Sequence, residues 1–310
     1  MGTANMHDVN STRAWNERRQ PGALAAAALA AFFAFAPAHA ASKVEETDPA
    51  ATGSIDRGAA HEVRIRQTKA GREGLELSAR LVEDGGLIAL PVSWVVENAD
   101  GEKIYNEKVP VADMLLSPGD YKVTVKYGTV TVEEMVTVLE AQQLGVTFTL
   151  NVGGIRVLPR LQGLGLPAAK SETAIYALSG IAKGKRVASS KRPGEIIRVG
   201  SGAYRVETRF VPGNAVATAD VVVTPGLMSA VEIDHAAGLA RLSLANPSPA
   251  TVDWTISDAA GKSLPAIKGL SADVVLKPGR YTARATIDGD ERVSEFSIEA
   301  GETRSVIIAN

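Results

Sequence analysis

LSPGDYKVTVKY at residues 116–127 is the stretch that decides the fold, because it recurs twice further along the chain. The later copies are VGSGAYRVETRF at 199–210 and LKPGRYTARATI at 276–287. After each tyrosine, apolar and polar residues alternate, which is the pattern of a half-buried β-strand. A Pro-Gly pair in two of the copies sets a tight turn before the strand. We expect each tyrosine ring in a core, with its hydroxyl on a nearby backbone group.

Three further segments recur in the same order, with a period of roughly 80 residues. They are an opening strand, an aromatic strand followed by a Gly turn, and a closing hairpin. The aromatic strands are centred on Trp94, Tyr176 and Trp254. The chain is therefore predicted to be all-β, with three tandem β-sandwiches of about seven short strands each. We place these repeats at 71–151, 152–235 and 236–310.

The L-x-P-G-x-Y-x-V corner, the tryptophan strand and the closing G-x-x-x-x-V resemble the small immunoglobulin-like or prealbumin-like repeats of bacterial envelope proteins. Carboxypeptidase-regulatory-like and PEGA-like modules belong to that group. The resemblance covers residues 71–310. It implies a non-catalytic module that serves as a spacer, a stalk or a binding surface.

Residues 1–40 have the pattern of a secretory signal peptide. Arg13, Arg18 and Arg19 precede an uncharged run, GALAAAALAAFFAFA at 22–36, and Ala38-His39-Ala40 offers a cleavage site. The run is short for a membrane span, although a short membrane anchor is the alternative. We expect export by the Sec or the Tat route, no transmembrane segment in the mature chain, and a disordered tether at 41–70. The predicted location is the periplasm, with secretion or outer-membrane association as alternatives.

The composition argues against most catalytic chemistry. The chain has no cysteine, which excludes disulfides, thiolate metal sites and a cysteine nucleophile. Its four histidines are His7, His39, His61 and His235, and no metal-ligand spacing or G-x-S-x-G motif accompanies them. We therefore predict no enzyme activity, no cofactor and no metal, with His235 as a solvated residue at a repeat junction.

Aromatic residues are few, and most of them fall at repeated positions. Eight are assigned to the cores: Trp94, Tyr121, Tyr127, Tyr176, Tyr204, Phe210, Trp254 and Tyr281. Because stacking on bases or sugars uses exposed rings, this assignment argues against nucleic acid as a partner.

Charge is distributed unequally although the net charge is only −2. The repeat at 71–151 has 6 basic and 13 acidic residues, whereas the repeat at 152–235 has 11 basic and 6 acidic residues. We define the basic patch as the cations Lys183, Lys185, Arg186, Lys191, Arg192, Arg198, Arg205 and Arg209. This patch is a candidate surface for an anionic partner, or else a solvated face that blocks edge pairing. The opposite charges of the two repeats also suggest head-to-tail self-association.

The function predicted from these features is that of an exported, non-enzymatic envelope protein. It would act as a spacer or scaffold, or as a module that binds another envelope protein. The alternative is a binder of an anionic envelope component, such as a lipid head group, lipopolysaccharide or peptidoglycan, through the middle repeat.

Overall fold

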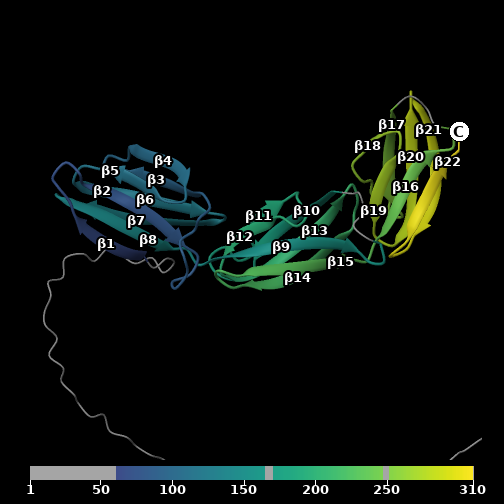
Figure 1. Cartoon of the computed structure of the whole chain (residues 1–310). Helices are drawn as coiled ribbons and strands as arrows, with labels where there is room; N and C mark the ends of the chain where they lie inside the picture. The colour runs from purple at the N-terminus through teal and green to yellow at the C-terminus, as the bar shows by residue number, and fades with distance from the viewer. Residues whose placement is uncertain (1–60, 165–169, 247–250, 310) are drawn as a thin grey trace, which may run out of the picture. The chain divides into compact units, whose positions relative to one another are not determined.

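The computed structural model of the chain describes residues 61–164, 170–246 and 251–309. Apart from one further strand at the start, the described strands form three sets of seven, and each set folds into two facing sheets (Figure 1). None of the described residues is helical, so the prediction of an all-β chain of tandem sandwiches is confirmed. Within the described residues there is accordingly no helix that could cross a membrane. The signal peptide expected at 1–40 and the tether residues 41–60 lie outside the described part.

The three sandwiches have the same order of strands. The first contains β2 (Gly74–Arg80), β3 (Val92–Glu97), β4 (Lys103–Val109), β5 (Ala112–Leu115), β6 (Gly119–Tyr127), β7 (Val130–Val138) and β8 (Gln142–Thr149). The second contains β9 (Val152–Leu161), β10 (Lys170–Ala177), β11 (Arg186–Ser190), β12 (Ile196–Gly200), β13 (Gly202–Val211), β14 (Val216–Val223) and β15 (Met228–His235). The third contains β16 (Gly238–Leu244), β17 (Val252–Asp258), β18 (Ile267–Gly269), β19 (Ala272–Leu276), β20 (Gly279–Ile287), β21 (Asp290–Ile298) and β22 (Thr303–Ile308).

The sheets repeat one topology. One sheet of each sandwich has the order β4-β3-β6-β7, β11-β10-β13-β14 or β18-β17-β20-β21, and all its neighbours are antiparallel. In the other sheet, the first strand of the sandwich pairs in parallel with the last one, as β2 does with β8, β9 with β15 and β16 with β22. The sequence repeat is therefore a repeat of topology.

The corner tyrosines are buried in all three sandwiches, as predicted. Each hydroxyl donates a hydrogen bond to the carbonyl four residues earlier in the chain. The distances are 2.7 Å from Tyr121 to Ser117, 2.8 Å from Tyr204 to Gly200 and 2.9 Å from Tyr281 to Lys277. The bond fixes the turn before the strand and satisfies the one polar atom of a buried ring.

Trp94 and Trp254 are fully buried at equivalent positions of the first and third cores. Their indole N–H groups donate to the carbonyls of Val109 and Gly269, at 3.1 Å and 3.0 Å. The prediction that Tyr176 is their counterpart is wrong. Tyr176 lies opposite the exposed Arg205 on the outward face of β10.

Thr173 holds the tryptophan position in the second sandwich. It lies opposite Thr208, four residues after Tyr204, just as Trp94 lies opposite Val125, four residues after Tyr121. The two threonines leave room for a polar interior, and His235 occupies it with only 1% of its surface exposed. The prediction that His235 is solvated is therefore wrong.

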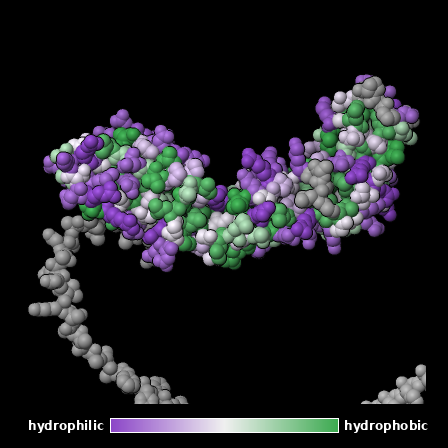
Figure 2. All heavy atoms as spheres, in the orientation of Figure 1, coloured by the Kyte–Doolittle hydropathy of each residue, from purple (hydrophilic) through white to green (hydrophobic). Residues whose placement is uncertain are grey.

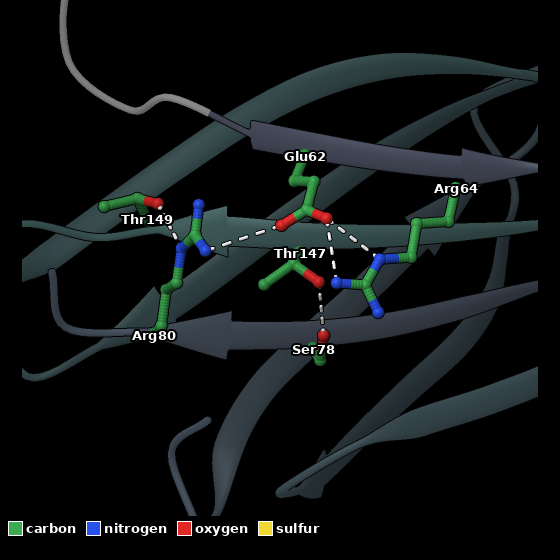
Figure 3. Close-up of polar contacts among 6 residues, drawn as sticks. All are labelled: Glu62, Arg64, Ser78, Arg80, Thr147 and Thr149. Atoms are coloured by element: carbon green, nitrogen blue, oxygen red, sulfur yellow. Dashed lines mark hydrogen bonds and ion pairs between the residues drawn. The ribbon is translucent and has the colours of Figure 1, made fainter. Parts of the chain in front are cut away.

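A further strand, β1 (His61–Gln67), lies inside the segment expected to be a disordered tether. It pairs antiparallel with β8 over seven residues and covers the edge of the first sandwich. Figure 3 shows the side chains around Glu62, which accepts a hydrogen bond from Arg80 of β2 at 3.4 Å and so links β1 to the sandwich. Glu62 also accepts one from Arg64 of its own strand at 2.9 Å. Strand β1 thus begins ten residues before the predicted boundary at residue 71.

Candidate functional site

The basic patch predicted for the second sandwich is divided in the structure. Lys183 and Lys185 lie in the turn between β10 and β11, and Arg186 begins β11. Lys191 and Arg192 lie after the other end of that strand. The whole length of β11 therefore separates the two groups of cations.

Several cations of the patch have carboxylate partners on the same sandwich. Arg205 forms two hydrogen bonds with Asp220, at 2.8 Å and 2.9 Å, across β13 and β14. The bonds from Arg205 hold the pKa of Asp220 below its usual value. Lys191 lies 3.3 Å from a carboxylate oxygen of Glu172. Paired cations of this kind contribute little net positive charge to a surface.

Two further pairs are longer, and one cation of the patch lies elsewhere. Arg192 is 3.8 Å from Glu195, and Arg209 is 3.9 Å from Glu207. Arg198 belongs to β12 in the opposite sheet, where its guanidinium lies 5.2 Å from the centre of the Tyr127 ring. The structure therefore does not bring Arg198 together with the other seven cations.

Besides Arg198, the cations of the basic patch without a carboxylate partner in the described part of the chain are Lys183, Lys185 and Arg186, and these three are exposed. They share their turn with Ile181, whose side chain is fully exposed at 103% of its reference surface. We call residues 181–186 the basic turn. It combines an apolar tip with three cations, which is the chemistry of a contact with an anionic, partly apolar surface.

A shallow groove of about 210 Å³ runs beside the basic turn on the outward face of β10, β11 and β13. It is lined by Arg186, Lys191 and Arg209, but also by the carboxylates of Glu172 and Glu207. The mixture of charges and the small volume fit a solvated surface better than a pocket for one anion.

The third sandwich has a larger hollow of about 900 Å³, which was not predicted from the sequence. Three arginines line it together with Glu295: Arg280, Arg284 and Arg304. The alternation of β20 places Arg280 and Arg284 on the outward face, a signal that was present in the sequence. Arg284 pairs with Glu291 at 3.0 Å and Arg304 with Glu302 at 3.4 Å, so most of this charge is compensated locally.

The described residues contain no group of three or more His, Asp or Glu side chains placed to hold a metal ion. The buried polar residues among them are serines, threonines, Glu73 and His235, and Glu73 and His235 are bonded to a backbone N–H and to a hydroxyl, not to a second titratable side chain as in acid–base pairs.

Comparison with known proteins gives one family match. Residues 246–310, in the third sandwich, match the family model described as the Rhizobiales growth-associated tandem repeat domain. The match covers less than half of the chain. No curated protein matches the sequence.

Solved structures offer distant likenesses. The TIE protein of Bacillus anthracis is 15% identical over 84% of this chain and 59% of its own, with a TM-score of 0.23. The pilus adhesin SpaC from Lactobacillus rhamnosus GG is 11% identical over 81% of this chain and 44% of its own, with a TM-score of 0.24. A streptococcal ancillary pilin is 11% identical over 80% of this chain and 99% of its own, with a TM-score of 0.27. The chain thus spans only part of the length of the first two proteins.

Proposed function

We propose that this chain is an exported, non-enzymatic scaffold of a bacterial cell envelope, in which three β-sandwiches act as a spacer or present surfaces to another envelope protein. The observation that carries the proposal is the use of the aromatic residues as internal filling. Trp94, Trp254 and Phe210 are completely enclosed. Among the described Phe, Trp and Tyr residues, only the rings of Tyr105 and Tyr176 are partly exposed, and they lie on different sandwiches, so they form no shared platform for sugars or bases.

Two features of the sequence support the envelope as the location. The leader at 1–40 is predicted to direct export into the periplasm. The corner motif, with its resemblance to carboxypeptidase-regulatory-like and PEGA-like modules, is in keeping with that location. The growth-associated description of the family that matches 246–310 supports a role connected with growth.

Fractionation and affinity capture test this proposal. We expect the chain, tagged at its C-terminus and expressed with its own leader, to be recovered from the envelope fraction. Cross-linking in cells followed by capture is expected to recover a defined set of envelope proteins. A strain that lacks the chain is expected to show an envelope or growth defect, restored by the wild-type chain. Recovery only from the cytoplasm, or turnover of an envelope substrate by the purified chain, would contradict the proposal.

A second candidate function rests on the basic turn. The exposed Ile181 among Lys183, Lys185 and Arg186 favours contact with an anionic envelope surface. We expect the chain to bind vesicles that contain anionic lipid at low salt and to release them as salt rises. The variant Lys183→Glu/Lys185→Glu/Arg186→Glu is expected to lose this binding. The matched control, Arg205→Gln/Asp220→Asn, alters an internally compensated pair and is expected to retain it. Equal binding by both variants would exclude the basic turn as the contact.

A further inference from the structure

The edge strand β14 differs from its two structural equivalents, β7 and β21. All three are the last strand of a four-stranded antiparallel sheet, and each forms a backbone ladder with only one neighbour in the described residues. At the end of β14, the carbonyl of Val222 also accepts a 3.4 Å hydrogen bond from the Ser229 hydroxyl of β15, which a pairing strand would have to displace. Such an edge exposes backbone N–H and C=O groups that can pair with another strand. Proteins commonly protect these edges with charged side chains.

The first and third sandwiches carry that protection and the second does not. β7 reads VTVEEMVTV, with two adjacent glutamates, and β21 reads DERVSEFSI, with four charged residues. β14 reads VATADVVV, with Asp220 as its one charged residue. Arg205 on the neighbouring β13 compensates that charge with the two hydrogen bonds described above. The edge of β14 therefore has no free charge to oppose pairing.

The outward side chains of β14 are largely apolar and exposed. Val216 and Val222 keep 37% and 72% of their surface exposed. Leu227 and Met228, which follow in the turn and in β15, are also exposed. Figure 2 shows apolar surface on the side of the second sandwich where Figure 1 places β14. β-branched residues on an extended edge favour further strand pairing.

The sequence of β14 is complementary to itself in one antiparallel register. With Ala219 opposite Ala219 of a second copy, Val216 lies opposite Val222 and Thr218 lies opposite Asp220. Side chains that face each other across an antiparallel pair lie on the same face of the sheet, so the two exposed valines would cover each other. A register centred on Asp220 would instead oppose two carboxylates. The same register in β7 would oppose Glu134 to itself.

We propose that β14 pairs antiparallel with β14 of a second copy of this chain, about a two-fold axis at Ala219, and so joins two four-stranded sheets edge to edge. The interface is isologous, because each copy contributes the same strand. It goes beyond the proposed scaffold function, since it makes the second sandwich the point at which two chains associate.

Sedimentation of the purified chain, expressed with its own leader, tests this proposal. We expect a concentration-dependent dimer. Val222→Lys places a charge opposite Val216 at both ends of the pairing and is expected to raise the dissociation constant about tenfold or more. The matched control is Thr137→Lys, at the equivalent outward position of β7, and we expect it to leave the dimer unchanged. Circular dichroism checks that both variants keep their strand content. If Val222→Lys fails to fold, Thr218→Lys replaces it as the variant that places a charge in the pairing interface.

Disulfide trapping tests the register itself, because the natural chain has no cysteine. Mild oxidation of Val216→Cys/Val222→Cys is expected to give a covalently linked dimer. The control Thr131→Cys/Thr137→Cys on β7 is expected to stay monomeric. A wild-type chain that is monomeric at all accessible concentrations would overturn the proposal, even if the same edge takes a strand from another protein. A dimer that Val222→Lys leaves unchanged, or one trapped only through β7, would also overturn it.

Discussion

The imidazole Nε2 of His235 lies 2.7 Å from the hydroxyl oxygen of Thr208 inside the second sandwich. The edge of the ring faces Phe210, with 4.7 Å between ring centres. Nδ1 has no hydrogen-bond partner among the described residues. In the first sandwich, Val125 and Leu150 hold the equivalent positions and form part of an apolar core. The second sandwich thus has a buried polar pair at the place where the first sandwich has two apolar side chains.

This pair predicts a pH dependence of stability. Burial lowers the pKa of His235, and the nearby charge of Asp234 opposes that shift only in part. The unfolded chain binds a proton near the ordinary pKa of about 6.5, whereas the folded sandwich resists it. The free energy of opening should therefore be greatest above that pH and should fall as the pH decreases below it. Hydrogen exchange of the β13 amides between about pH 8 and about pH 5 measures this change.

The variant Thr208→Val/His235→Leu provides the control, because it restores the residues of the first sandwich. We expect it to remove the additional loss of stability of β13 at low pH. His235→Leu alone leaves the Thr208 hydroxyl buried without its partner, which should cost about 1–3 kcal/mol. Amides of β6 in the first sandwich report any pH effect that is common to the whole chain. An unchanged pH response in the double variant would show that His235 is not the titrating group.

Trp94→Ala should strongly destabilise the first sandwich. The side chain is completely buried and its N–H group is bonded to Val109, so truncation leaves a large cavity and an unpaired carbonyl. The expected cost is about 3–5 kcal/mol. Tyr176→Ala, on the outward face of β10, should change stability by less than about 1 kcal/mol. Urea unfolding of both variants, followed by circular dichroism, tests the core assignment, and equal costs would show that it is wrong.

The hydrogen bonds of the corner tyrosine hydroxyls should each make a moderate contribution to the stability of their sandwich. Tyr121→Phe and Tyr204→Phe remove only the hydroxyl that donates to the carbonyl four residues earlier. Each variant should lose about 0.5–1.5 kcal/mol of its sandwich's stability, since the ring still fills its place. Hydrogen exchange of the β6 and β13 amides separates the two sandwiches. A loss confined to one of the two variants would mean that the corners are not equivalent.

Strand β1 should open independently of the sandwich that it covers. Val63 and Ile65 keep 47% and 61% of their surface exposed, so little apolar area holds the strand in place. We expect its amides to exchange faster than those of β2 and β6. Glu62→Ala removes the acceptor of Arg64 and Arg80 and should accelerate exchange in β1 alone. Exchange of β1 at the rate of β2 would show that the strand is an integral part of the first core.

The repeated corner made the fold predictable, because a turn followed by alternating residues specifies a strand and its buried face. The prediction for Tyr176 was wrong because it aligned this residue with Trp94 and Trp254 on aromatic character alone. It did not use the strand register, which is fixed by the position of Tyr204 on the neighbouring strand. Counting from that tyrosine places Thr173 in the core and Tyr176 outside. The polar environment of His235 could not be predicted, because its hydrogen-bond partner Thr208 lies on a different strand, 27 residues earlier in the chain.

The basic patch shows a similar limit of sequence reasoning. Counting charges identified the excess of cations on the second repeat, but pairing depends on which strands are neighbours. Asp220 is 15 residues from Arg205 and meets it only because β13 and β14 are adjacent. β1 was missed because its short run of mixed residues has a weak pattern, and backbone pairing with β8 stabilises it.

The parallel pairing of the first and last strands has a mechanical consequence for each sandwich. Once β1 has been pulled away from the first sandwich, the chain enters each sandwich through β2, β9 or β16 and leaves through the partner strand, which points the same way. Tension applied at the two ends would have to slide these strands lengthwise past each other. Their hydrogen bonds would then break together instead of unzipping one by one, so every repeat is built to resist pulling.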